Sequence, residues 1–244
     1  MSNKIKNQKE QGFSMVELAI VLAIIALIVG AVAVGKDLQR NAEYRKIANK
    51  FIGQWAQAYN QYYERTGVVI GDSFDSPTGQ VGAGVASGGA VTGFTASVTG
   101  SSLADTMIKF GIRIPQGNGR GTGEQASVSG AGNHKSDSAT TYRYLDQSGI
   151  PHLLRVSFVY TATSANGNGL IGNMMLLENI TPKLGSTTDS MIDGVVEYNA
   201  GYFRGSSNWA NTGGGVNAST VGSDNKAAEE TAEANLTATW KMNQ

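Results

Sequence analysis

The chain has 244 residues, 41% hydrophobic and 16% charged, a composition that allows the packed core of one large domain or two small ones. Lys plus Arg and Asp plus Glu both total 19, so the basic excess typical of nucleic-acid-binding proteins is missing. The absence of cysteine excludes disulfides, thiolate metal sites and cysteine nucleophiles. Two histidines, His134 and His152, argue against a multi-histidine metal site.

The N-terminus joins a short polar segment to a long apolar one. Residues 1–12 carry three lysines against one acid, and residues 13–35 are apolar with a single charge, Glu17. As a helix, 13–35 would be about 34 Å long, enough to cross a hydrocarbon core of roughly 30 Å. Because positive charge stays on the cytoplasmic side, the segment 1–12 is predicted inside and the chain beyond Lys36 outside the membrane.

The order of these segments is not that of an ordinary secretory signal. In such a signal the cleavage site follows the apolar region, at a small-x-small motif. Here the obvious boundary, between Gly12 and Phe13, precedes the apolar run. Cleavage at this boundary would remove the charges and leave the helix on the mature protein, which indicates that the helix has a later role.

The residues from Gly12 to Leu18 read G-F-S-M-V-E-L. This segment resembles the prepilin leader of type IV pilins and type II secretion pseudopilins. The resemblance is close over about residues 9–36 and extends in character to about Gly67. It implies cleavage after Gly12 by a prepilin peptidase, followed by N-methylation of the new amino terminus at Phe13.

Glu17 is a carboxylate within the apolar run. Its insertion into a membrane would cost roughly 2.5–3.5 kcal/mol on insertion scales. The resemblance implies a partner, the free amine of Phe13 on the same or a neighbouring subunit. A desolvated charge pair would fix the register of apolar helices that otherwise slide, since misregistration strands both charges. The alternative is that Glu17 lies near the membrane surface and reaches water.

Residues 36–66 have the pattern of an amphipathic helix, and Gly67 is a plausible stop. Gly30, Gly35 and Gly53 are points where the helix could bend, although Gly30 and Gly35 equally fit close helix packing. The aromatic group Trp55, Tyr59, Tyr62 and Tyr63 is interpreted as core rather than as a binding site. The predicted buried face comprises Leu38, Ala42, Ile47, Ala48, Phe51, Ile52, Trp55, Ala58, Tyr59 and Tyr62.

The head, residues 67–244, is predicted to be rich in strands. Thr141–Leu145 and Leu153–Tyr160 are predicted to form an antiparallel hairpin, the second strand with one buried face. Residues 174–179 fit either a short helix or a strand. Weaker strand signals lie around Val81, Val91 and Val98 and at Ile108–Ile114, and residues 117–123 form a glycine-rich loop without phosphate-loop context.

Three further head segments bear on function. Val68–Asp72 partly resembles the turn that follows the long helix in pilin-like proteins, with Ile70 where proline usually stands. In the pseudopilins that this chain resembles, acidic loops in the region of Asp189 and Asp193 can hold calcium, which makes these two residues weak calcium candidates. Two carboxylates alone are too few to specify a calcium site. The preferred interpretation is turn-forming and capping aspartates. The tail 226–244 either packs on the head or stays mobile.

Together these features predict an α+β protein, with a long N-terminal helix packed on an antiparallel β-sheet head. The expected segments are a cleaved leader (1–12), a membrane-spanning or filament-core half-helix (13–35), an amphipathic half-helix (36–66) and the head (67–244). No Gly-x-Ser-x-Gly elbow, zinc motif or Walker loop is present, so no enzyme activity is predicted. No cofactor is expected beyond the weak calcium candidates.

The resemblance implies a subunit of a type IV pilus or related filament. The large head without cysteine favours a minor or atypical pilin. The alternatives are a type II secretion pseudopilin, or a membrane-anchored or filament-tip adhesin or ligand-binding pilin. The implied partners are other pilins, the prepilin peptidase and N-methyltransferase, and an inner-membrane assembly platform. DNA binding is disfavoured because basic residues in 72–244 are few and scattered. The expected location is the bacterial inner membrane, then a surface pilus or periplasmic pseudopilus.

Overall fold

The computed structural model describes residues 14–84, 94–115, 117, 139–162, 169–206, 209 and 235–242. The leader 1–12, Phe13, Val91, His134 and nearly all of the glycine-rich loop 117–123 lie outside these residues. The chain divides into two compact units, Met1–Asn41 and Ala42–Gln244.

Helix runs continuously from Met15 to Thr66. It comprises α1 (Met15–Ile47), a five-residue π-helical segment η1 (Ala48–Ile52) and α2 (Gly53–Thr66). Gly67 ends it in the left-handed conformation, with φ 73° and its N–H donated to the Tyr63 carbonyl at 2.8 Å. The predicted helix and its glycine stop are thereby confirmed. Glycine suits this position because it adopts the left-handed backbone conformation without a Cβ penalty.

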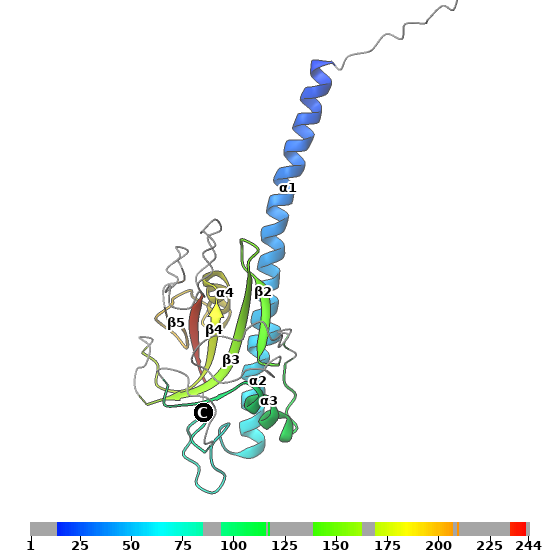
Figure 1. The fold of residues 1–244 in the computed structure, drawn as a ribbon. Helices are drawn as coiled ribbons and strands as arrows, with labels where there is room; N and C mark the ends of the chain where they lie inside the picture. Colours follow the sequence, from blue (N-terminus) through cyan, green and yellow to red (C-terminus); the bar gives the residue numbers. More distant parts are fainter. Residues whose placement is uncertain are drawn as a thin grey trace, which may run out of the picture. The chain divides into compact units, whose positions relative to one another are not determined.

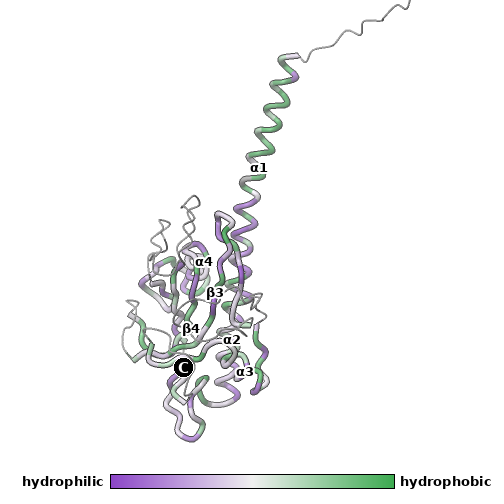
Figure 2. The backbone as a smooth tube through the Cα atoms, in the orientation of Figure 1, coloured by the Kyte–Doolittle hydropathy of each residue, from purple (hydrophilic) through white to green (hydrophobic). Residues whose placement is uncertain are grey.

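Hydropathy changes along α1, from strongly hydrophobic in its first part to more hydrophilic in its last turns (Figure 2). The buried face of the second unit begins at Tyr44, later than predicted. Leu38 and Ala42 are exposed, and so is Tyr63 on α2. The remaining residues of the predicted face are buried, with Tyr44 and Ala56 in addition.

The π-helical segment η1 was not predicted. It adds one residue to a turn, which shifts the register of the buried face between α1 and α2. Phe51 and Ile52 consequently face the core together with Trp55. Gly53 follows directly, and a Cβ there would lie 3.3 Å from the Ala48 carbonyl oxygen. At Gly53, where the sequence predicted a possible bend, the π-helical segment changes back to α-helix, and the helix continues without a break.

The head contains one six-stranded antiparallel sheet (Figure 1). The strand order is β1-β3-β4-β6-β5, with β2 also paired to β3. The predicted hairpin is confirmed as β2 and β3, and the undecided segment 174–179 is part of β4. The strands are β1 (Ala96–Thr99), β2 (Thr141–Leu145), β3 (Pro151–Thr161), β4 (Gly172–Ile180), β5 (Phe203–Gly205) and β6 (Leu236–Lys241).

The main core lies between α2 and one face of the sheet. Phe158 on β3 stacks on Tyr59 with ring centroids 4.7 Å apart and meets the edge of Trp55 at 6.4 Å. All three rings are buried, as are Met175 and Leu177 on β4. This arrangement confirms the long helix packed on an antiparallel sheet, and it confirms the structural interpretation of Trp55, Tyr59 and Tyr62.

The opposite face of the sheet is buried as well, against the expectation of one buried face. Val159 on β3 and Met174 and Leu176 on β4 form a second cluster with Leu170. Ser157 on β3, which pairs with Leu176 on β4, is also fully buried. The alternation along β3 predicted one buried face, and this prediction was wrong because Val159 packs on the second face with these apolar residues.

Two segments differ from the predicted elements. Ile108 and Lys109 end a helix, α3 (Gly100–Lys109), and no strand forms at 108–114. Leu103 and Met107 are buried at helical spacing, which was overlooked. Val81 lies in a turn rather than a strand, whereas Val98 lies in β1.

The end of the chain completes the sheet. Leu236–Lys241 forms β6 between β4 and β5, so this part of the tail packs on the head. The strand that follows Gly201, β5, is an edge strand and precedes β6 in the chain. An additional helix, α4 (Pro182–Ile192), starts at the Thr181-Pro182 step. Proline at the first helical position needs no N–H partner, which explains this start.

Asp72 organises the loop that follows the long helix. Its carboxylate accepts hydrogen bonds from the backbone of Ser73, Thr78 and Gly79 and from the Thr78 hydroxyl, at 2.7–3.0 Å. Asn173 on β4 ties the same loop to the sheet through Gly79 and Val81. Burial alone would raise the pKa of Asp72, but these hydrogen bonds hold it below its usual value.

Candidate functional site

Ser14 and Glu17 form a reciprocal cap at the start of α1. The Ser14 Oγ accepts the Val16 N–H at 3.2 Å, and the Ser14 N–H donates to Glu17 Oε2 at 3.3 Å. The Ser-x-x-Glu spacing of a capping box explains this geometry, since each side chain satisfies a backbone donor of the first turn. The Glu17 carboxylate is thereby held against the amide that directly follows Phe13.

This cap gives Glu17 a local role that the membrane argument did not include. Gly12 and Phe13 lie outside the described residues, so their positions are known only from the sequence. If the chain is cut after Gly12, the new amine belongs to Phe13, one residue before the amide that Glu17 already binds.

The apolar part of α1 is unburied within the chain. Over its most apolar 18-residue stretch no residue is buried, and the helix is long and apolar enough to cross a membrane. The core helix of a soluble protein can be as long and as apolar, but it is mostly buried. This apolar stretch therefore differs from a core helix, and its length and composition allow it to lie in a membrane.

Gly30 and Gly35 lie within the unbroken α1 helix. A Cβ at either position would meet no atom within 4 Å. Neither glycine is therefore needed for packing inside the single chain. Both sequence-based interpretations, a point of bending and a site of close packing against another helix, stay predictions.

Asp189 and Asp193 both act on the segment that follows α4. Asp189 Oδ2 accepts the Glu197 N–H at 2.8 Å and the Trp209 indole N–H at 3.1 Å. Asp193 Oδ2 accepts the Phe203 N–H at 2.9 Å. The two aspartates therefore fix the turn between α4 and β5, which agrees with the preferred turn-forming interpretation.

Asp189 is fully buried, and its Oδ1 atom has no hydrogen-bond partner in the described structure. Burial raises the pKa of Asp189 to about 6, and the negative charges of Asp193 and Glu197 add to the rise. Within the described residues no group of three or more His, Cys, Asp or Glu is placed to hold a metal ion. A calcium role for Asp189 and Asp193 stays a sequence-based prediction.

The raised pKa of Asp189 predicts a pH-dependent stability. Between about pH 3.8 and 6 the folded chain binds more protons at this carboxyl than the unfolded chain, so stability falls as the pH rises through this window. The loss above pH 6 is on the order of 3 kcal/mol. Asp189→Asn removes the titration, so its thermal midpoint at pH 7.5 should exceed the wild-type value by several degrees, with little difference at pH 4.

The matched control for this prediction is Asp105→Asn on the exposed face of α3. Thermal unfolding of the full-length chain in detergent, followed by circular dichroism at both pH values, gives the comparison. An Asp189→Asn variant that is less stable than wild type at pH 7.5 would contradict the prediction. It would show that the Trp209 and Glu197 hydrogen bonds outweigh the desolvated charge.

A second buried polar group was missed by the sequence analysis. His152 lies on β3 with Nδ1 2.7 Å from Asn235 Oδ1 and Nε2 3.2 Å from Asp146 Oδ2. Asp146 is fully buried in the β2–β3 turn, where its Oδ1 also accepts the Ile150 N–H. The network ties the start of β6 to the hairpin. The only sequence signal was an aspartate in the predicted turn, because Asn235 is 83 residues away from His152.

Comparison with known protein families finds the prokaryotic N-terminal methylation motif at residues 7–33. No curated protein and no solved structure matches the chain. This motif, of the prepilin cleavage and methylation type, is typical of type IV pilins and pseudopilins. With the long helix and antiparallel sheet, the motif supports a type IV pilin-like or pseudopilin-like subunit that is structural rather than catalytic, and together with the apolar helix it suggests anchoring in the inner membrane before assembly.

Proposed function

We propose that the chain is a minor or atypical pilin, a structural subunit of a type IV pilus or related filament. The observation that carries the proposal is the apolar helix, which follows a prepilin motif and is not buried within its own chain. An ordinary signal helix would be removed, whereas this one is continuous with the core helix of the head. It is suited to leave the bilayer and join other helices.

Assembly through this helix costs little hydrophobic free energy. Lipid tails are as apolar as leucine, so transfer of α1 from lipid to a bundle of like helices is driven by packing rather than by burial from water. Packing alone leaves the axial position poorly defined. Glu17, paired with the Phe13 amine of itself or of a neighbour, supplies the register.

The proposed segments follow from this mechanism. Residues 1–12 are the cytoplasmic leader that the prepilin peptidase removes after Gly12. Residues 13–35 span the membrane and later the filament core, 36–66 support the head, and 67–244 form the surface outside. The partners are neighbouring pilins, the peptidase and N-methyltransferase, and the inner-membrane assembly platform.

A pseudopilin of a type II secretion system is the second candidate, because the matched motif is common to both groups. The two differ in where the assembled chain is found. Surface filaments are sheared from cells and analysed by quantitative mass spectrometry, with a strain lacking the prepilin peptidase as control. A rare chain in the filaments supports the minor pilin, and an abundant one an atypical major subunit. Absence from the filaments would contradict both pilus assignments.

A further inference from the structure

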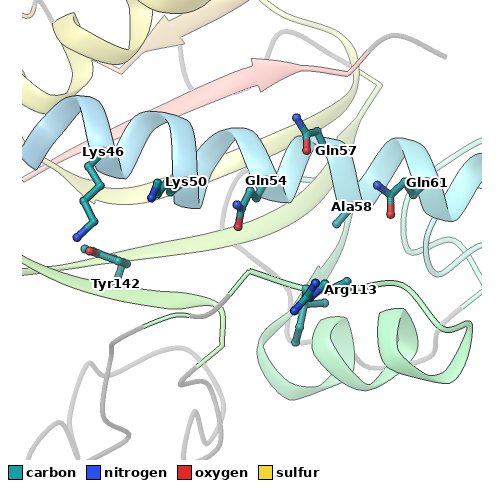
Figure 3. Close-up of a pocket in the computed structure, with 9 residues that line it drawn as sticks. Lys46, Lys50, Gln54, Gln57, Ala58, Gln61, Arg113 and Tyr142 are labelled. Carbon is teal, nitrogen blue, oxygen red and sulfur yellow. The ribbon is translucent and has the colours of Figure 1, made fainter.

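A groove of about 500 Å³ runs along the exposed side of the helix in the second unit. One wall is the helix face from Lys46 to Gln61, and the other consists of Arg113 and Ile114 after α3 and Tyr142 on β2. Figure 3 shows the Lys46 side chain extending toward Tyr142 across this groove. The structure therefore has a groove beside the core helix that is lined by side chains from three elements of the head.

The groove is cationic. Lys46, Lys50 and Arg113 line it, and no acidic side chain does so among the described residues. In that part of the structure their side chains make no hydrogen bond or ion pair, whereas Arg65 caps two carbonyls of the α3 end and Arg155 pairs with Glu178. Three cations without partners in one groove favour an anionic ligand.

One acid, Glu43, lies close to the groove, one helical turn before Lys46. Burial raises the pKa of Tyr142, and the charge of Glu43 adds to that rise, so Glu43 faces the same end of the groove. It offsets part of the charge of Lys46 but leaves Lys50 and Arg113 unopposed. The anion should therefore bind beyond the Lys46 end of the groove.

The shape of the groove favours an extended peptide over a small anion. The stretch from Lys46 to Gln61 spans about 22 Å of helix, which matches an extended peptide of about six or seven residues. Gln54, Gln57 and Gln61 continue the polar stripe past the lysines. Their amides both donate and accept hydrogen bonds, as a peptide backbone requires.

The chain itself contains a segment of suitable charge. Residues 224–233 read DNKAAEETAE, with four acids against one lysine. This segment connects β5 to β6, at the end of the strand order that is opposite β1 and β3. The groove is formed with β2, which pairs with β3. The strands that flank the segment in the chain, β5 and β6, and the strands beside the groove, β2 and β3, thus lie on opposite sides of β4 in the strand order.

We propose that the groove binds the acidic segment 224–233 of a neighbouring copy of the chain. The proposal rests on the proposed filament function in its atypical major form, because copies of the chain must be adjacent in the filament. A contact between two different surfaces is heterologous, and repeated head to tail it generates an open filament rather than a closed dimer. The charges would steer and select the contact, in addition to the register set by the N-terminal helices.

Cysteine crosslinking tests the contact directly, because the natural chain contains no cysteine. A copy with Lys50→Cys and a second, differently tagged copy with Glu230→Cys are expressed together at full length. Sheared filaments are treated with a short bis-maleimide. We expect a crosslinked dimer that carries both tags, at least about fivefold more abundant than with Lys183→Cys, an exposed lysine on α4, in place of Lys50→Cys.

Charge reversal separates electrostatic pairing from simple proximity. Lys50→Glu and Glu230→Lys should each reduce the amount of chain in filaments several-fold, and the double variant should restore it. Filaments that contain the chain without the specific crosslink would overturn the groove proposal and leave the pilin function standing. Retention of the chain by DNA that Lys50→Glu abolishes, with no crosslink, would reassign the groove to nucleic acid. Absence of the chain from all filaments would overturn both proposals.

Discussion

Glu17→Gln should remove the chain from assembled filaments while leaving its amount in the membrane unchanged. The substitution keeps the size and the capping geometry of the side chain but removes its charge, so the Phe13 amine of a processed subunit loses its partner. An uncompensated charge in an apolar bundle costs several kcal/mol, and about 1.4 kcal/mol corresponds to a tenfold change. A loss of at least tenfold in filament content is therefore expected.

The readout is the ratio of chain in sheared filaments to chain in the membrane fraction. Glu64→Gln is the matched control, because it removes an exposed glutamate from α2, within the head. The control should leave the ratio unchanged. Equal ratios for the Glu17 variant and wild type would show that Glu17 reaches water at the membrane surface and does not guide assembly.

Phe158→Ala should destabilise the head more than a substitution of any exposed ring. Phe158 is fully buried and packs against both Trp55 and Tyr59, so its truncation opens a cavity between the helix and the sheet. Phenylalanine-to-alanine changes in such cores cost about 3–5 kcal/mol. For a domain of this size that corresponds to a fall of roughly 10 °C in the thermal midpoint.

Thermal unfolding of the full-length chain in detergent measures this effect through the tryptophan fluorescence of the head. Tyr63→Ala serves as control, because Tyr63 is on the same helix but exposed. Its midpoint should stay within about 2 °C of wild type. Equal effects of the two substitutions would refute the packing of the helix on the sheet.

The sequence predicted the elements whose signals are local. The apolar run, the amphipathic repeat and the glycine at 67 define a helix without reference to the rest of the fold. The β2–β3 hairpin follows from an alternating strand and a Ser-Gly-Ile-Pro turn. The prepilin motif is likewise a contiguous pattern, and the comparison found it over residues 7–33.

Features that depend on distant partners could not be predicted in this way. The aspartate at 189 binds an indole 20 residues later, and the histidine at 152 meets an asparagine 83 residues later. The π-helical turn places Phe51 and Ile52 in the core that the helix shares with the sheet, and no local pattern in the sequence predicts such a turn. The α3 helix was missed because Leu103 and Met107, four residues apart, would also share one face of a strand.

The mature N-terminus of the chain recovered from cells tests the central claim most directly. Mass spectrometry of the purified protein should show that residues 1–12 are missing and that the chain begins with Phe13 carrying one added methyl group. A chain that still begins at Met1, or one cut after residue 35 so that the apolar helix is lost, would contradict the account.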